Sequence, residues 1–228
     1  MTCRFRASIP ALTGVALLLA VSALSRSAHA QTTFSNTTPI TINASGAAAP
    51  FPSQIAVSGL SGTITEITVA LFGFSHTFPD DVAILFAGPS NTNTVMLAGG
   101  PGSSVAAVNL NWVFSDSATE MLPITGALSS GTFLPGLNEY NDVLSAPAPA
   151  GPYATSFAGF TGADPNGIYS LYIQDFVTGD GGSLSGGWSI TITTNAVASV
   201  PEPGTALLFG TVGVPVLGLV ASRRRRRG

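Results

Sequence analysis

The sequence contains no lysine, and its 8 basic residues are arginines near the two ends of the chain: Arg4, Arg6, Arg26 and the run Arg223-Arg224-Arg225-Arg226-Arg227. Of the 11 acidic residues, only Glu202 lies outside residues 31–199. This central body therefore carries a charge of about −10 at neutral pH. A phosphate backbone would be repelled by it, which excludes a nucleic acid partner. The body also has no Lys or Arg with which a carboxylate could form a salt bridge.

Cysteine is almost absent as well, because Cys3 is the only one in the chain. The body therefore has no disulfide, no thiol nucleophile and no thiolate metal site. Carboxylates that cluster in such a body must be dispersed, protonated or neutralised by a bound cation. Outside the cell the available hard cation is Ca²⁺, which prefers oxygen ligands.

The body lacks a long helical pattern. Its apolar stretches are short and bounded by Gly, Pro, Ser, Thr and Asn, which predicts an all-β fold. The predicted strands are residues 39–43, 64–72, 82–87, 94–98, 110–114, 168–174 and 187–193. Residues 64–72 mostly alternate, so one face of that strand is expected to be wet, whereas residues 82–86 are apolar throughout and predict a central strand. Strands at this spacing favour a β-sandwich, jelly roll or Greek key.

Three local features predict where the loops, turns and core of this fold lie. Residues 122–160 are rich in loop residues, and we favour a long internal loop over an interdomain linker, because neither half alone has enough strands to close a sandwich. Gly179-Asp180-Gly181-Gly182 predicts a hairpin between the last two strands. Gly167 is expected to end a turn that begins at Asp164, and Trp188 is expected to anchor the final strand in the core.

The N-terminal 30 residues have the pattern of a secretory signal peptide. Arg4 and Arg6 precede an apolar stretch over residues 9–24, and the small-x-small motif Ala28-His29-Ala30 comes just before Gln31. This predicts cleavage by signal peptidase between Ala30 and Gln31. The alternative is a retained signal anchor, which the position of the motif disfavours.

Residues 200–228 contain Pro201-Glu202-Pro203, an uncharged apolar run over residues 204–222 and the arginine run. The apolar run has about the length of a membrane-spanning helix, and Pro215 within it is tolerable in a membrane. The arginines would stay on the cytoplasmic side. These three parts in this order resemble the PEP-CTERM sorting signal of Gram-negative bacteria. The resemblance implies transient anchoring in the inner membrane, cleavage by an exosortase and release to the cell surface or exopolysaccharide matrix. The alternative is a plain C-terminal anchor without cleavage.

Two passages of the body, residues 75–89 and 166–190, resemble the P domain (Homo B domain) that follows the catalytic domain of subtilisin-like proprotein convertases. The first contains His76-Thr77, an Asp before a buried strand and a Gly88-Pro89 turn; the second contains Asn166-Gly167, a strand ending in Asp175, a Gly-Asp-Gly-Gly turn and Trp188-Ser189-Ile190. The resemblance implies a jelly-roll β-sandwich of the galactose-binding-like type. Tyr169 and Val82 depart from the family pattern.

The body has one histidine, His76, and no Gly-x-Ser-x-Gly motif, so a serine nucleophile is not indicated. We expect His76 to pack or to hydrogen-bond in a turn. Ten carboxylates also allow many acid pairs of the glycosidase kind, but most of them lie in turn-like contexts where Asp caps a loop. For calcium, the candidates lie at strand ends and in the last turn, and the alternative is that they are solvated turn residues: Asp80, Asp81, Asp116, Asp175 and Asp180.

A galactose-binding-like fold suggests sugar binding, for which exposed aromatic side chains would serve as platforms; the loop candidates are Phe78, Tyr140, Tyr153 and Phe160. For each of them we favour the alternative, an aromatic side chain that anchors its own loop. We therefore expect a non-enzymatic surface or matrix protein that binds envelope polysaccharide or a surface protein. The alternative is an accessory protein of a subtilisin-like serine endopeptidase system, because P domains accompany such proteases. The chain has no room for the catalytic domain itself.

Overall fold

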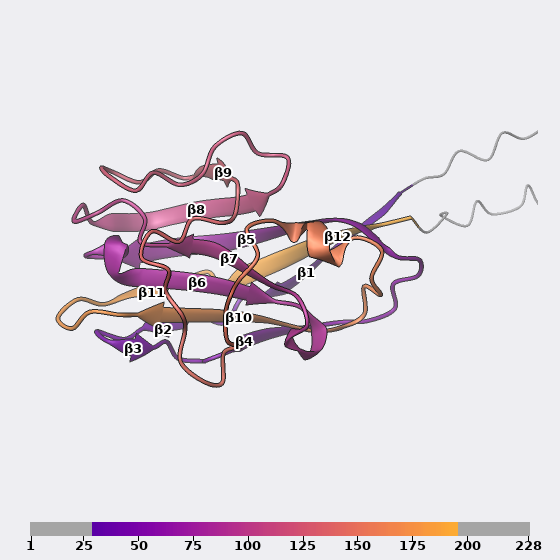
Figure 1. Cartoon of the computed structure of the whole chain (residues 1–228), viewed down its shortest axis with the longest axis horizontal. Helices are drawn as coiled ribbons and strands as arrows, with labels where there is room; N and C mark the ends of the chain where they lie inside the picture. The colour runs from indigo at the N-terminus through magenta and orange to yellow at the C-terminus, as the bar shows by residue number, and fades with distance from the viewer. Residues whose placement is uncertain (1–28, 196–228) are drawn as a thin grey trace, which may run out of the picture.

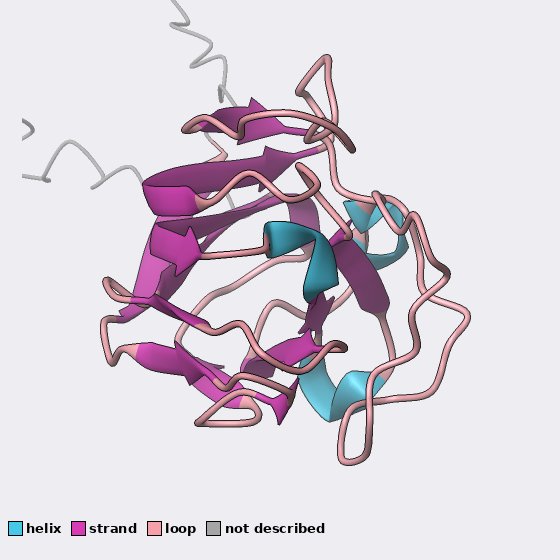
Figure 2. Ribbon diagram, turned by 90° about the vertical axis from the view of Figure 1, so that its left-hand side faces the viewer, coloured by secondary structure: helices cyan, strands magenta, loops and turns pink. Residues whose placement is uncertain are grey.

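The computed structural model describes residues 29–195, which form two β-sheets packed face to face (Figures 1 and 2). The predicted sorting tail and all of the predicted signal peptide before residue 29 lie outside these residues. Ala30 and Gln31, the two sides of the predicted cleavage site, lie at the start of the first strand. Between residues 29 and 195, no helix is long and apolar enough to cross a membrane.

The seven-stranded sheet is organised around one long strand, β5 (Ile64–His76). β12 (Trp188–Thr194) pairs with its first half and β11 (Gly182–Leu184) with its second half. β8 (Ala107–Ser115) pairs with its other side. The outer positions are taken by β1 (Ala30–Asn36) beside β12, β2 (Ile40–Ile42) beside β11 and β9 (Gly131–Phe133) beside β8. Only the β8–β9 pair is parallel.

The five-stranded sheet is centred on β10 (Gly167–Asp175) and β6 (Val82–Ala87). β7 (Thr94–Gly99) flanks β6, and both β3 (Gly46–Ala47) and β4 (Ser53–Val57) flank β10. Three short 3₁₀ helices lie between strands: η1 (Pro79–Asp81), η2 (Pro89–Asn91) and η3 (Phe157–Phe160). Every residue of β6 is buried, as its uninterrupted apolar sequence predicts.

Aromatic residues from both sheets meet in the core. The Phe86 ring on β6 contacts the Trp188 ring on β12 edge-on, with centroids 6.2 Å apart, and stacks near Tyr169 on β10 at 5.8 Å. Trp188 is fully buried, and its indole N–H donates to Ser53 Oγ at 3.0 Å. This confirms the core position predicted for Trp188 and ties the last strand to β4 across the sandwich.

A second, smaller core lies on the outer face of the five-stranded sheet. Leu85, Met96 and Tyr172 project from that face and are covered by the loop that follows β9, chiefly through Leu144 and Tyr153. Tyr153 donates its hydroxyl proton to Pro149 O at 2.9 Å and accepts from Leu144 N at 3.1 Å. The proline-rich segment is therefore fastened to the sheet by Leu144 and Tyr153 on either side of it and by Ala148 within it, which is the arrangement of an internal loop.

All seven predicted strands are present, several of them extended by one to four residues. Five short or polar strands were not predicted: β1, β3, β4, β9 and β11. The predicted hairpin at Gly179–Gly182 is wrong. β10 belongs to the five-stranded sheet, while β11 and β12 belong to the seven-stranded sheet, so this segment crosses from one sheet to the other. Gly182 is itself the first residue of β11.

The first and last strands lie side by side, with Ala30 opposite Thr194 and Asn36 opposite Trp188. The described chain therefore begins and ends at one end of the sandwich, on the right in Figure 1. Ile64, at the start of β5, lies at this same end opposite Thr194. The other end of β5, at His76, lies about 40 Å away at the usual rise of a strand.

Candidate functional site

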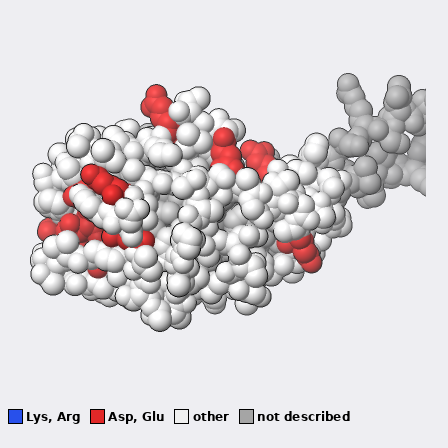
Figure 3. Space-filling model, in the orientation of Figure 1, with Lys and Arg blue, Asp and Glu red and all other residues white. Residues whose placement is uncertain are grey.

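Acidic side chains gather at the end of the sandwich opposite the termini, on the left in Figure 3. The strand ends and loops that meet there supply six of the body's carboxylates: Asp80, Asp81, Glu139, Asp142, Asp175 and Asp180. Lys and Arg are missing from residues 29–195, so this acidic end has no basic counterion within the described body.

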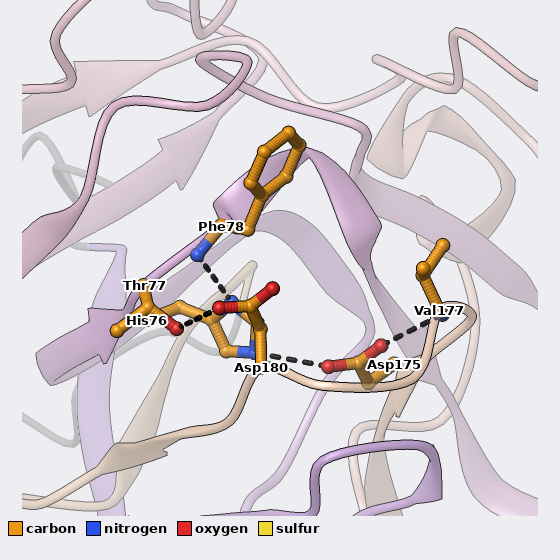
Figure 4. A network of polar contacts seen from close by, with 6 residues as sticks. All are labelled: His76, Thr77, Phe78, Asp175, Val177 and Asp180. Atoms are coloured by element: carbon orange, nitrogen blue, oxygen red, sulfur yellow. Dashed lines mark hydrogen bonds and ion pairs between the residues drawn. The ribbon is translucent and has the colours of Figure 1, made fainter.

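At the centre of this end, His76 and Asp175 form a pair that is completely shielded from solvent (Figure 4). His76 ends β5 and Asp175 ends β10, so the pair connects the two sheets. His76 Nε2 lies 3.1 Å from Asp175 Oδ2. On the other side of the ring, His76 Nδ1 accepts a hydrogen bond from the backbone N–H of Phe78 at 3.2 Å.

These contacts assign the histidine tautomer. A backbone N–H only donates, so Nδ1 must present a lone pair, and the ring proton is on Nε2, where it is donated to the Asp175 carboxylate. Asp175 uses its other oxygen to accept from Val177 N at 2.9 Å. Both ring nitrogens of His76 are therefore occupied, and neither is free to take a proton from a serine hydroxyl, as the base of a triad must.

The chain is packed tightly around this pair. Thr77 Oγ1 donates to Asp180 Oδ1 at 2.6 Å, which joins the end of β5 to the crossing segment before β11. Gly182 lies directly against β5, and a side chain there would overlap Ser75 O and the ring of His76. The glycine is required because β11 and the histidine ring approach so closely.

Beside the pair lies a hollow of about 330 Å³, lined by Asp80, Asp81, Tyr140, Asp142, Phe176 and Val177. Tyr140 comes from the long loop, and its hydroxyl donates to Asp80 Oδ2 at 2.9 Å. This hydrogen bond, together with the surrounding negative charge, raises the pKa of Tyr140 to about 12. Tyr140 therefore stays protonated and keeps Asp80 on one side of the hollow.

Two carboxyl groups in the hollow hold their protons more tightly than usual. Partial burial raises the pKa of Asp81, and repulsion from Asp175, Asp80 and Asp180 adds to the effect. Burial also raises the pKa of Asp142, with a further contribution from Asp80. In both groups burial is the larger cause, and the neighbouring carboxylates add to it.

The structure brings together four of the five predicted calcium ligands. Asp80, Asp81, Asp175 and Asp180 lie at the acidic end. Asp116 follows β8 at Ser115, which pairs with Thr68, about 25 Å along the sheet from His76. Its two carboxylate oxygens accept from Phe157 N at 3.0 and 2.9 Å, so Asp116 holds η3 in place. The grouping of Asp116 with the other four is therefore wrong.

Sequence reasoning missed Asp142 and Glu139, which enter the acidic end from the long loop. No strand or turn pattern marks them, because their position depends on how that loop packs. Within residues 29–195, no three Asp, Glu, His or Cys side chains are grouped so that they could hold one metal ion. Asp175 and Asp180 are already engaged by His76 and Thr77. Calcium binding therefore stays a prediction.

Of the four aromatic residues considered as sugar platforms, only Tyr140 is largely exposed, at 54%. Phe160 is buried beside Phe86, which excludes it as a platform and agrees with the alternative that it anchors its loop. Tyr153 is half-buried and fastens the long loop, and Phe78 is half-buried beside the His76 ring. Comparisons with models of known protein families, with curated proteins and with solved structures find no match to this chain.

Proposed function

We propose that this chain is an exported, non-catalytic β-sandwich protein that an exosortase sorts to the cell surface or extracellular matrix of a Gram-negative bacterium. There it binds envelope polysaccharide or a surface protein. The finer fold assignment belongs to the same proposal: a jelly roll of the galactose-binding-like type, related to the P domain. Signal peptidase and the exosortase are its partners during export.

The observation that carries the proposal is the position of the two ends of the body. β1 and β12 are neighbours, so the segments that precede residue 30 and follow residue 194 join the sandwich at one end. A body joined in this way suits delivery by an N-terminal signal and a C-terminal tail, because neither segment has to cross the folded surface. The acidic end is then directed away from the point of attachment.

A non-catalytic role is supported by the only histidine of residues 31–199. Its two nitrogens are bound to Asp175 and to the backbone of Phe78, and its side chain is buried. The environment of His76 is therefore that of a structural residue that connects the two sheets. The accessory role in a serine endopeptidase system has no comparable observation in its favour.

The test is to express the full chain in a Gram-negative host with its exosortase present or deleted, and to follow the C-terminus by mass spectrometry and membrane fractionation. We expect the tail to be removed near Pro201-Glu202-Pro203 only when the exosortase is present. Glu202→Ala should leave the uncleaved protein in the inner membrane. Glu120→Ala, which changes an exposed acid in the body, is the matched control and should be processed normally.

If the tail stays attached in the presence of the exosortase, and the protein fractionates with the inner membrane in both strains, the chain is a membrane-anchored protein and the sorting proposal fails. The processing experiment does not depend on which ligand the body binds.

A further inference from the structure

A second hollow, of about 550 Å³, lies on the outer face of the five-stranded sheet beside η2. The long loop covers most of this face with Leu144 and Tyr153. The floor of the hollow is formed by side chains of β4 and β10 that the long loop leaves uncovered. They are Gln54 and Ser170, which lie opposite each other in register, and Tyr172. Ser90 and Asn91 of η2 form the opposite wall.

The wall and floor are held together firmly. Gly167, which begins β10, has a φ of +140° and lies so close to η2 that an added side-chain carbon would be 2.6 Å from the Pro89 ring. Ser90 and Asn91 have positive φ values of 57° and 55°. For residues other than glycine such values are uncommon, and they concentrate where the surrounding structure holds the backbone in place for function. The close approach of Gly167 to Pro89 therefore fixes the wall of the hollow against its floor.

The polar side chains that line the hollow are neutral. The carboxamide of Asn166 is fully engaged by Leu60 and Asp164, whereas Gln54, Ser170, Tyr172 and Asn91 are only weakly engaged. Gln54 Nε2 is 3.4 Å from Ser170 Oγ, and the Tyr172 hydroxyl is 3.5 Å from Asn91 Oδ1, both at the long limit of hydrogen bonding. The remaining polar atoms of these two carboxamides, Gln54 Oε1 and Asn91 Nδ2, have no hydrogen-bond partner within residues 29–195. The hollow thus offers an acceptor, a donor and several hydroxyl groups to a ligand.

The lack of charged side chains in the lining indicates which class of ligand the hollow can bind. No Asp, Glu, His, Lys or Arg lines this hollow, so a phosphate or carboxylate would find no cation and a metal ion would find no carboxylate. Ile168, exposed at 52%, stands at the rim with Pro89 and adds an apolar surface. A ligand that fits must be uncharged, carry several groups that both donate and accept, and present some C–H surface.

We propose that this hollow binds a neutral hexopyranose unit of an oligosaccharide or polysaccharide. Adjacent sugar hydroxyls both donate and accept, so they match the carboxamide groups of Gln54 and Asn91, which present a donor and an acceptor side by side. The C–H face of the sugar lies on Ile168 and Pro89. The inference rests on the proposed function, in that it takes the polysaccharide to be the ligand, and it locates that contact away from the acidic end.

The experiment uses the full chain in lauryldimethylamine oxide micelles, because a maltoside detergent would itself compete. Cellotetraose, maltotetraose, mannotetraose and tetragalacturonate are titrated separately and followed by saturation-transfer NMR and calorimetry. We expect at least one neutral tetrasaccharide to bind and the anionic tetragalacturonate not to bind. Gln54→Ala and Asn91→Gly should each weaken binding about tenfold, the loss expected for one hydrogen bond.

Asn91→Gly keeps the positive φ, so the backbone of η2 is preserved. Asn141→Gly is its matched control, because Asn141 is also exposed with a φ of 53° but lies in the long loop at a different hollow. Near-ultraviolet circular dichroism and the melting temperature establish that each variant is folded.

If no neutral tetrasaccharide binds at millimolar concentration, the sugar site is refuted, while export and tail processing are judged by their own experiment. If one binds but Gln54→Ala and Asn91→Gly leave its affinity unchanged, the protein binds sugar elsewhere and the assignment of this hollow is overturned.

Discussion

His76 is the residue whose environment most directly decides between a structural and a catalytic role. Its ring proton is donated to Asp175, and its free lone pair accepts from Phe78 N, all without access to water. Removing the imidazole by His76→Ala leaves the Asp175 carboxylate buried with one backbone donor. Breaking a buried pair in this way costs about 3 kcal/mol or more.

We therefore predict that His76→Ala lowers the free energy of unfolding by about 3 kcal/mol in urea denaturation. Asp175→Asn should also destabilise, because the asparagine oxygen is needed by Val177 N and its amide would then face the Nε2–H of His76. The two losses should not add, since the side chains share one contact. Thr77→Ala, which removes only an exposed hydrogen bond, should cost about 1 kcal/mol or less.

The catalytic alternative makes a different prediction with the same variants. If His76 activated a serine, a fluorophosphonate probe would label the wild-type protein, and the label would disappear in His76→Ala while remaining in Thr77→Ala. We expect no specific labelling of the wild type.

At the scale of elements, the acidic end should make stability depend on pH. Asp81 and Asp142 have pKa values raised above 3.8 in the folded protein, mainly by burial. The folded state therefore binds these protons more tightly than the unfolded chain does. Stability consequently falls as pH rises from 3.8 through the raised pKa values, and the cost is present in full at pH 7.

The variant Asp81→Asn/Asp142→Asn should therefore melt at a higher temperature than the wild type at pH 7, and the difference should shrink towards pH 4. Both residues use only their backbone groups to hold the loops, so the exchange leaves those hydrogen bonds in place. Asp164→Asn is the control, and its effect on the melting temperature at pH 7 should have the opposite sign. Hydrogen bonds from Asn166 lower the pKa of Asp164, so that its stabilising effect is lost on acidification.

Millimolar Ca²⁺ should act in the same direction as acid, by neutralising the same carboxylates. A ligand that binds only the folded state adds about 2.7 kcal/mol when its concentration is one hundred times its Kd. We expect a higher melting temperature in calcium than in EGTA, and a smaller shift in the double variant. Equal melting temperatures in calcium and EGTA would end the calcium assignment and leave the acidic end as a solvated surface.

Strands that bury a continuous or alternating apolar sequence, such as β5 and β6, were predictable, because burial sets their pattern. β1 was missed because only Phe34 of its side chains packs against the core, and β11 because its three residues carry a single buried Leu184. The hairpin prediction failed because a glycine-rich turn specifies a sharp change of direction but not the sheet to which the chain goes next.

The candidate site was predictable only in part, for a related reason. Asp80, Asp81, Asp175 and Asp180 lie at ends of strands that the topology brings together. Asp116 also follows a strand, but that strand runs antiparallel to β5, so its last residue is at the opposite end. Which of two strand ends a residue occupies depends on strand direction, and direction is a property of the whole sheet.

At the scale of the whole molecule, the termini and the acidic end lie at opposite ends of a sandwich about 40 Å long, measured along β5. If the tail spans a membrane before cleavage, the body should stand with Thr193 near the lipid and Val177 far from it. The lack of cysteine makes this measurable, because Cys3 lies in the predicted signal peptide and a single new cysteine is a unique label.

We predict that a donor fluorophore on Thr193→Cys transfers energy strongly to acceptors in the lipid headgroups of liposomes that contain the full chain, with Cys3→Ser in place. The same donor on Val177→Cys, which is exposed at 50%, should transfer weakly. Lipid-free micelles give the zero of each measurement. Equal transfer from both positions would mean that the sandwich lies flat on the membrane, in which case the acidic end lies beside the lipid headgroups and is not directed away from the point of attachment.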